Sequence, residues 1–297
     1  MRGIILAAGK GTRLGAITQG IGDDGIGTSK GLVYTYDKPT VYYPLHDLIL
    51  AGIDDIQIIA APENVDQYSS LLGSGDHLGI NLSYGIQEVP RGIAEAFIIG
   101  KRFIGNGSVA LTFCDNIFNG KQFSAKMHAN TNPRGAVVFA LPVDNPEAYG
   151  VVEFDNEGNA ISIEEKPEQP KSHYAVPGMY FYDSSVVEVA RNITPSARGE
   201  LEISSVNEAY LREGRLRVEP LGDQTKWFDT GTEESLFAAS SYVRSFERRT
   251  NRLIGSPEAA AFLSGFIDTE GLMRLAEPLK KAEYGKKLER LAHNGSW

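Results

Sequence analysis

Near the start of the chain stands Gly3-Ile-Ile-Leu-Ala-Ala-Gly-Lys-Gly-Thr-Arg13, an apolar run that leads into a glycine-rich turn. The run over 4–8 is continuous and not alternating, which predicts a fully buried strand. Gly9 and Gly11 allow the backbone to turn sharply and to present successive N–H groups to an anion. The hydroxyl of Thr12 and the guanidinium that follows it add donors for phosphate oxygens. The stretch predicts a phosphate-binding loop, although a strand that ends in an ordinary glycine turn has the same pattern.

Two well-known phosphate-binding loops that also follow a strand do not fit this stretch. The dinucleotide loop G-x-G-x-x-G would need a third glycine where the chain has Leu14. The ATPase loop would need four residues between its glycines and then Lys-Ser or Lys-Thr. With these two loop types excluded, the stretch is a glycine-rich turn that carries an arginine, and such a turn suits a nucleoside triphosphate.

The chain has 297 residues, enough for one large α/β domain or for a core domain with a small helical appendage. Hydrophobic residues make up 42% and charged residues 23%, as in ordinary globular proteins. No apolar run approaches the roughly 20 residues of a membrane span, so we expect no membrane partner. The net charge of −9 disfavours binding to nucleic acid. A phosphate ligand therefore requires a local group of basic side chains.

Cysteine and histidine usage favours a reducing, cytoplasmic location. Cys114 is the single cysteine, so no internal disulfide can form. The five histidines are scattered without the spacing of a zinc site. The first residues also predict a core strand and not a cleavable signal.

Strand and helix patterns alternate through the first half of the chain. Strands are predicted over 4–8, 55–61, 81–86, 108–113 and 135–141, and helices from Pro39 to about Gly52 and near 64–73 and 92–102. This alternation predicts an α/β fold with a Rossmann-like, mostly parallel open sheet and helices on both faces. Ligands of such sheets bind beyond the carboxyl ends of the strands.

The pattern changes near residue 149. A hairpin is predicted over 151–164, a strand over 178–183, helices over 202–213 and 233–250, and a largely helical tail from residue 256. We therefore expect a main domain over 1–250, with a core mainly over 1–145 and a smaller β lobe mainly over 146–232. The segment 251–297 would form a C-terminal helical extension.

The segment 15–31 is rich in glycine and aspartate and predicts a mobile lid, because long loops without regular structure are usually functional or disordered. It separates Arg13 from Lys30, the next basic candidate for a phosphate ligand.

Two acidic residues lie at the ends of predicted elements. Asp115 follows a buried strand, and Asp229 lies in Lys226-Trp-Phe-Asp-Thr-Gly-Thr232. Each could instead cap a helix or form a turn. Together they could hold one Mg²⁺, which usually takes few protein ligands and completes its shell with phosphate oxygens and water.

Two further pairs could bind the rest of a nucleotide and a sugar. In Ile163-Glu-Glu-Lys-Pro167, Lys166 could meet a sugar phosphate and Glu165 could accept hydrogen bonds from hydroxyl groups, although charged residues at a strand end are more often solvated surface. The amide of Gln87 could pair with a pyrimidine edge, and Gly92 allows a flat base to approach the backbone.

Nine stretches, in the same order, resemble the hexose-1-phosphate nucleotidylyltransferases and within them the short-form glucose-1-phosphate thymidylyltransferases. The matching stretches are Leu6-Ala-Ala-Gly-Lys-Gly-Thr-Arg-Leu14, Tyr36-Asp-Lys-Pro39, Tyr42-Tyr-Pro-Leu45, Ala51-Gly-Ile53, Asp115-Asn-Ile-Phe118, Tyr149-Gly-Val-Val-Glu-Phe-Asp155, Glu164-Glu-Lys-Pro167, Arg198-Gly-Glu-Leu-Glu-Ile203 and Phe228-Asp-Thr-Gly-Thr232. They run from the first strand into the last third of the chain.

The resemblance implies a Mg²⁺-dependent enzyme that joins dTTP and glucose 1-phosphate into dTDP-glucose and pyrophosphate by in-line displacement. It assigns triphosphate binding to Gly9, Gly11, Thr12, Arg13 and Lys30, base recognition to Gln87 and Gly92, and the metal to Asp115 and Asp229. Arg13, Asp115, Lys166 and Asp229 would be catalytic, with Lys166 on the sugar phosphate and Trp227 beside the metal. Asn116, Tyr149, Gly150, Glu165 and Val176 would line the sugar pocket.

The chain departs from the usual pattern of the family at several positions near the nucleotide. The family commonly has glycine at the position of Ala8, glutamine at that of Gly31 and glycine at that of Cys114. Near the base, the family usually has residues other than Arg91 and Glu95. UTP therefore remains an alternative to dTTP, and other hexose 1-phosphates remain open.

An alternative from a different functional class is a regulatory homologue that binds a nucleotide sugar and catalyses no reaction. The resemblance also implies a homotetramer with a second nucleotide-sugar site at subunit contacts, although the tail could equally pack on its own subunit.

Overall fold

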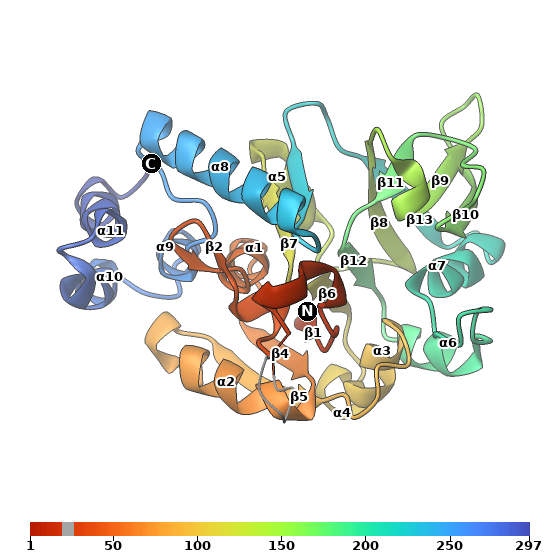
Figure 1. Cartoon of the computed structure of the whole chain (residues 1–297), viewed down its shortest axis with the longest axis horizontal. Coiled ribbons are helices and arrows are strands. Elements are labelled where there is room, and N and C mark those ends of the chain that lie inside the picture. Colours follow the sequence, from red (N-terminus) through yellow and green to blue (C-terminus); the bar gives the residue numbers. More distant parts are fainter. Residues whose placement is uncertain (20–26) are drawn as a thin grey trace.

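A computed structural model describes residues 1–19 and 27–297 of the chain. Its main sheet has the strand order β10-β9-β11-β8-β12-β6-β1-β4-β5, and β13 pairs with β8 (Figure 1). These strands span Arg2–Ala7 (β1), Asp55–Ala60 (β4), Asn81–Ile86 (β5), Val109–Phe113 (β6), Ala136–Pro142 (β8), Gly150–Phe154 (β9), Ala160–Glu165 (β10), Tyr174–Val176 (β11), Met179–Tyr182 (β12) and Leu216–Pro220 (β13). The predicted Rossmann-like α/β sheet is confirmed.

The sheet has a parallel half and an antiparallel half. Strands β5, β4, β1 and β6 run parallel, with Ile5 opposite Ile58 and Thr112. Strand β12 is antiparallel to both β6 and β8, and β11, β9 and β10 continue the antiparallel ladder. The predicted hairpin over 151–164 thus extends the central sheet through β11.

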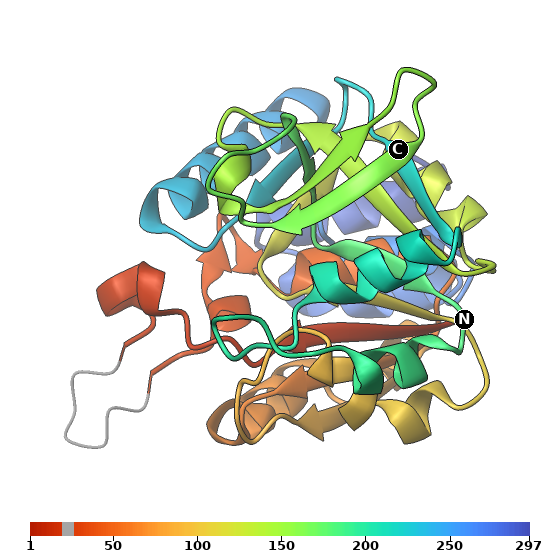
Figure 2. The same ribbon diagram turned by 90° about the vertical axis from the view of Figure 1, so that its right-hand side faces the viewer.

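Helices cover both faces of the sheet, as predicted. One face, which includes Ile5, packs against α1 (Tyr42–Leu50), α2 (Pro62–Leu72), α5 (Lys121–Ala129) and α9 (Pro257–Leu263). The other face, which includes Ile4, packs against α3 (Glu95–Ile99), α6 (Val186–Asn192) and α7 (Ile203–Arg212). Figure 2 shows β1 running through the centre of this arrangement. Strand β1 is therefore buried from both sides, which explains its uninterrupted apolar sequence.

The last helices pack beside the parallel half of the sheet, away from β9 and β10 (Figure 1). They are α8 (Glu233–Thr250), α9, α10 (Thr269–Ala276) and α11 (Glu283–Asn294). Glu247 of α8 is fully buried, and its carboxylate accepts hydrogen bonds from Lys38 Nζ at 3.1 Å and Lys287 Nζ at 2.9 Å. This buried ion cluster joins α11 to α8 and to Lys38. A buried charge is costly without a partner of opposite charge, so loss of one of these side chains would destabilise the contact.

Two predicted helices have other bounds in the structure. Pro39 belongs to a short hairpin of β2 (Tyr34–Thr35) and β3 (Lys38–Pro39), so the prediction that it opens a helix is wrong. The hairpin is held by the Thr40 hydroxyl, which donates to the carbonyl of Val33, and α1 begins only at Tyr42. The predicted helix over 92–102 begins at Glu95 and is divided at Gly100 into α3 and α4 (Lys101–Ile104).

The described residues also form five short 3-10 helices: Thr12–Ile17, Lys30–Leu32, Asp76–Leu78, Pro146–Ala148 and Glu277–Leu279. The centre of the predicted lid, residues 20–26, lies outside the described residues. Within the ranges that the structure describes, no helix has both the length and the apolar character needed to cross a membrane.

Candidate functional site

The glycine-rich loop leaves β1 after Ala7 and enters the 3-10 helix that begins at Thr12. Gly11 has a φ of 65°, and its carbonyl accepts a hydrogen bond of 2.7 Å from the Thr18 hydroxyl. A Cβ atom at Gly11 would lie 3.1 Å from both Lys30 Cγ and Thr18 Oγ1. Glycine is thus needed at this turn both for its backbone angle and for the space that Lys30 occupies.

Two open cavities meet at this loop. The first has a volume of about 250 Å³ and the second about 390 Å³, and Gly9 lines both. Of the predicted site residues, the first cavity is lined by Gly9, Arg13, Lys30, Asp115, Asn116, Tyr149, Gly150, Glu165, Lys166, Val176 and Asp229, and the second by Gly9, Thr12 and Gln87. Gly11 and Gly92 line neither cavity. The structure therefore brings together most of the predicted site residues, but not all of them.

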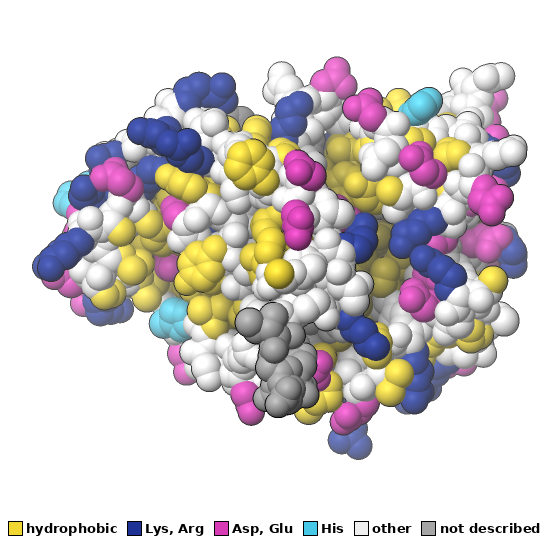
Figure 3. All heavy atoms as spheres, in the orientation of Figure 1, with side chains coloured by type: hydrophobic (Ala, Val, Ile, Leu, Met, Phe, Trp, Pro, Cys, Tyr) yellow, Lys and Arg dark blue, Asp and Glu magenta, His cyan; other side chains and the backbone are white. Residues whose placement is uncertain are grey.

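The surface view agrees with this placement. Figure 3 shows basic side chains gathered on the face of Figure 1, where the antiparallel half of the sheet meets the centre of the molecule. A local basic group is what an acidic chain needs in order to bind a phosphorylated ligand.

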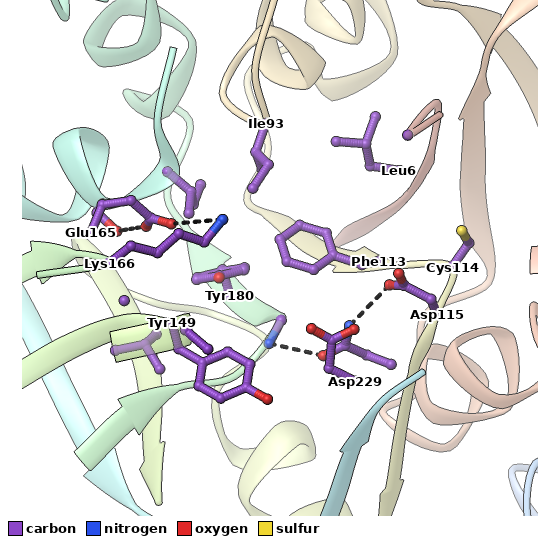
Figure 4. Close-up of a pocket in the computed structure, with 18 of the residues that line it drawn as sticks. Leu6, Ile93, Phe113, Cys114, Asp115, Tyr149, Glu165, Lys166, Tyr180 and Asp229 are labelled. Carbon is purple, nitrogen blue, oxygen red and sulfur yellow. Dashed lines mark hydrogen bonds and ion pairs between the residues drawn. The ribbon is translucent and has the colours of Figure 1, made fainter. Parts of the chain in front are cut away.

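The two predicted metal-binding carboxylates are brought together by a separate pair of short strands. In this pair, β7 (Asn116–Asn119) is antiparallel to β14 (Lys226–Asp229), and Asp229 lies opposite Asn116. The backbone N–H and the hydroxyl of Thr230 both donate to the carbonyl of Asp115 at 2.9 Å. Figure 4 shows the carboxylates of Asp115 and Asp229 beside each other in the first cavity.

Basic groups flank each carboxylate. Lys30 Nζ lies 3.1 Å from Asp115 Oδ2, and an Arg13 guanidinium nitrogen lies 3.8 Å from Asp229 Oδ2. Burial alone would lower the pKa of Lys30, but the charge of Asp115 and the hydrogen bond to it, together with the neighbouring Cys114 and Asp229, outweigh burial and raise the pKa. Burial raises the pKa of Asp229, and the neighbouring charge of Asp115 raises it further. The site therefore holds two anionic groups that would gain from an additional positive charge.

This chemistry fits Mg²⁺. Asp115 and Asp229 offer hard oxygen ligands, and a bound divalent cation would offset the repulsion that raises the pKa of Asp229. Among the residues with a described placement, no three His, Cys, Asp or Glu side chains cluster as a complete metal site. A magnesium ion held by these two carboxylates would therefore complete its shell with ligand oxygens and water.

Asn116 links the metal corner to the sheet. Its Nδ2 donates to Asp115 Oδ1 at 3.1 Å, and its Oδ1 accepts from Trp227 Nε1 at 2.7 Å and from the Gly178 N–H at 3.2 Å. The Trp227 ring also packs on Tyr149, with a centroid distance of 4.9 Å. Asn116 lines the first cavity, as expected of a sugar-pocket residue, but it also fixes the orientation of Asp115.

The opposite end of the first cavity carries Glu165 and Lys166 (Figure 4). Lys166 has a φ of 43°, and its N–H donates to the Tyr149 carbonyl at 2.9 Å. Glu165 accepts a hydrogen bond from the Ser204 hydroxyl and lies 3.7 Å from an Arg198 guanidinium nitrogen. The strand end thus directs both charged side chains into the cavity.

Ser204 and Arg198 were not assigned a role from the sequence. Arg198 lies within a stretch that carries the family resemblance, and this stretch could have identified it as a site residue. Ser204 is a hydroxyl in the first turn of α7, and only its contact with Glu165 marks it out.

The candidate base-binding residues lie at the edge of the parallel half. Gln87 follows β5, and its backbone N–H donates to the Ala60 carbonyl at 2.9 Å. Its side chain is buried, and Nε2 donates to the Gly92 carbonyl at 3.2 Å. Gly92 has a φ of 115°, and a Cβ atom there would lie 2.4 Å from the backbone nitrogen of Leu201. Glycine is therefore required at this position.

The arrangement as a whole combines a glycine loop, two carboxylates, basic side chains and a polar pocket around adjoining cavities. Such a site can hold a polyphosphate beside a small hydroxylated ligand, and it can stabilise negative charge that develops between them.

Comparison with known proteins agrees with this chemistry. The nucleotidyl transferase family profile matches residues 2–245. The chain is 50% identical to the glucose-1-phosphate thymidylyltransferase of Mycolicibacterium smegmatis over 98% of this chain and 99% of the relative. It is 49% identical to the protein of the same name from Neisseria meningitidis, over 98% and 99% of the two chains.

Solved structures show the same fold. A Bacillus anthracis protein assigned as a glucose-1-phosphate thymidylyltransferase, in complex with a sucrose, superposes with a TM-score of 0.73 at 38% identity, covering 82% of this chain and 95% of the other. A UDP-glucose pyrophosphorylase complexed with UDP-glucose superposes with a TM-score of 0.68 at 22% identity, covering 82% and 98%. At that identity the second match shows the fold alone.

Proposed function

This chain belongs to the nucleotidyl transferase family, and from that membership we propose that it transfers the thymidylyl group of dTTP to glucose 1-phosphate. The products would be dTDP-glucose and pyrophosphate. The observation that carries the proposal is the convergence of Arg13, Asp115, Lys166 and Asp229 on one cavity beside the glycine loop. Identity of about one half to enzymes of that name, over nearly the whole chain, supports the choice of substrates.

The triphosphate would lie across the loop. Backbone N–H groups near Gly9 and Gly11 and the Thr12 hydroxyl would donate to phosphate oxygens, and Lys30 would add a positive charge. Arg13 would stabilise the departing pyrophosphate, because its guanidinium offers several donors to phosphate oxygens. Asp115 and Asp229 would hold Mg²⁺, which, when bound, neutralises phosphate charge.

The sugar phosphate would enter at the Lys166 end of the cavity. A phosphate oxygen of glucose 1-phosphate is already ionised near neutral pH, so its attack on the α-phosphorus needs no protein base. Lys166 would position this oxygen for in-line displacement, and the chain would act by orientation and electrostatic stabilisation. Asn116, Tyr149, Gly150, Glu165 and Val176 would surround the hexose.

Gln87 and Gly92 would contact the pyrimidine. Thymine and uracil share the same hydrogen-bonding edge and differ by one methyl group, which a hydrophobic contact discriminates by about 1 to 3 kcal/mol. UTP is therefore the competing nucleotide, and another hexose 1-phosphate is the competing acceptor.

A regulatory homologue without activity is the other candidate. Such a protein has no need of charged groups at the reacting atoms, whereas Arg13, Asp115, Lys166 and Asp229 all line the first cavity here. This observation favours the enzyme.

Pyrophosphate release tests the proposal. We expect release from dTTP only when glucose 1-phosphate and Mg²⁺ are both present, and we expect EDTA to stop it. Binding of dTTP without pyrophosphate release would instead favour the regulatory homologue.

The assembly remains a separate proposal, and we infer a homotetramer. Tyr34 of β2 is 62% exposed and Phe237 of α8 is 71% exposed. The two elements are in contact, and the N–H of Tyr36, directly after β2, donates to the Ser240 hydroxyl of α8. Exposed aromatic side chains on adjoining elements are typical of protein contacts. A monomeric mass by light scattering would contradict this inference.

A further inference from the structure

The side-chain amide of Gln87 is held by two acceptors. Its Nε2 donates to Glu95 Oε2 at 2.8 Å and to the Gly92 carbonyl at 3.2 Å. A carboxylate and a carbonyl can only accept, so the amide must turn its NH₂ group towards both of them. The orientation of Gln87 is therefore imposed by its surroundings, and the reverse orientation would place its oxygen against two other oxygens.

Both acceptors are themselves fixed. An Arg91 guanidinium nitrogen lies 3.7 Å from Glu95 Oε1. The segment that carries Gly92 is pinned to Leu201, whose N–H donates to the Arg91 carbonyl at 2.7 Å and whose carbonyl accepts from the Ala94 N–H at 3.0 Å. The amide is thus held between a charged side chain and a rigid turn.

One group of the held amide remains available to a ligand. Gln87 Oε1 accepts no hydrogen bond from the described residues, yet it is not among the fully buried polar atoms without a partner. Since Gln87 lines the second cavity, this oxygen is open to it.

An acceptor that is fixed in this way discriminates between base edges. Thymine and uracil present an N3–H donor, which matches Gln87 Oε1. Cytosine presents an N3 acceptor at the same position, which places acceptor against acceptor. A mismatch of this kind leaves buried polar groups unpaired and costs binding energy.

We propose that Glu95 is a positioning residue that selects the imide edge of thymine or uracil by fixing the side-chain amide of Gln87. The proposal rests on the proposed nucleotidyl transfer. It concerns the orientation of one amide and predicts no discrimination between dTTP and UTP, which share that edge.

The decisive variant is Glu95→Gln. It keeps the size of the side chain but adds an NH₂ group, so that only the Gly92 carbonyl still opposes the reverse orientation of Gln87. We expect the ratio of kcat/KM for dTTP over dCTP to fall by about tenfold or more. The ratio for dTTP over UTP and the KM for glucose 1-phosphate should stay as in the wild type. The control is Glu208→Gln, which changes another helical glutamate paired with an arginine four residues away.

A double-mutant cycle tests whether Glu95 acts through Gln87. In a Gln87→Ala background, Glu95→Gln should change the dTTP to dCTP ratio by no more than about twofold. The proposal is overturned if Glu95→Gln leaves the ratio unchanged in the wild-type background, lowers kcat/KM equally for all nucleotides, or keeps its effect without Gln87.

Binding measurements separate this proposal from the proposed function. Calorimetric titration of dTTP and dCTP into the same variants reports base selection even if no nucleotide is turned over. An inactive wild type that still binds dTTP better than dCTP, and loses that preference in Glu95→Gln, would contradict the enzyme but support the role of Glu95. Equal preferences in both proteins would contradict the role of Glu95 whatever the activity.

Discussion

The two cavities that meet at Gly9 are built in different ways. The first is lined by charged side chains from distant segments, such as Lys30 with Asp115 and Arg13 with Asp229, which pair across the site. The second is lined mainly by loop residues, and the buried amide of Gln87 is held there by a glycine carbonyl and a carboxylate. Charge is concentrated where phosphates would react, and hydrogen-bond geometry is fixed where a base would be read.

This difference predicts that substitutions in the first cavity impair function most when they remove a charge. Substitutions at the second cavity should impair function most when they change the geometry of the site. The variants below test it in order of decreasing effect.

The largest effect is expected from Asp115→Asn. The change keeps the size of the side chain but removes one of the two carboxylates that face each other, and with it the charge that would hold Mg²⁺. We expect kcat to fall by about 10³-fold, measured as pyrophosphate release, while thermal unfolding changes little. The control is Asp66→Asn, an exposed residue of α2. Normal turnover in Asp115→Asn would remove Asp115 from the metal role.

Lys166→Ala should have the next largest effect. It removes the ammonium group that would meet the sugar phosphate, so the KM for glucose 1-phosphate should rise by about 10- to 100-fold while the KM for dTTP changes less. Lys171→Ala, which removes an exposed lysine paired with Glu164, is the matched control. An unchanged KM for glucose 1-phosphate in Lys166→Ala would contradict the assignment.

Gly92→Ala tests the turn that holds Gln87 at the second cavity. The added Cβ would meet the backbone of Leu201, so we expect a loss of about 1 to 3 kcal/mol in the free energy of unfolding and a raised KM for the nucleotide. Gly158 also has a positive φ but has no atom within 4 Å of an added Cβ. Gly158→Ala therefore separates the cost of the backbone angle from that of the collision. Equal nucleotide KM values in both variants would contradict the role of Gly92.

The smallest effect is expected from Trp227→Phe. It leaves the aromatic contact with Tyr149 but removes the Nε1–H that holds Asn116, and so loosens the orientation of Asp115. We expect kcat to fall roughly three- to tenfold, with little change in the KM for either substrate. The other tryptophan, Trp297, lies at the C-terminus, and Trp297→Phe should leave kcat unchanged. A larger change in KM than in kcat would show that Trp227 acts on binding instead.

Functional side chains that directly follow a buried strand could be predicted from the sequence more readily than the residues that contact them. Asp115 and Gln87 could be predicted because each follows a strand whose carboxyl end lies at the ligand-binding edge. The strands β7 and β14 were not predicted, since four residues are too few for a clear periodicity. Yet their pairing is what brings Asp229 to Asp115.

Contacts between distant side chains could not be predicted either. The bond from Ser204 to Glu165 and the bond from Gln87 to Glu95 depend on how α7 and α3 pack on the sheet, and no local pattern reports that packing. Pro39 misled the helix prediction because it was taken as a helix-opening residue, whereas it pairs with Tyr34 in a hairpin. Tertiary contacts outweighed the local preference at that point.

The most direct test of the account is ³¹P NMR of the wild-type protein mixed with dTTP, glucose 1-phosphate and Mg²⁺. The account predicts that the signals of both substrates decline together and that those of dTDP-glucose and pyrophosphate replace them in equal amounts. A spectrum that stays unchanged, or one in which dTTP alone is hydrolysed while glucose 1-phosphate remains, would contradict the claim that the two cavities form one nucleotidyl transfer site.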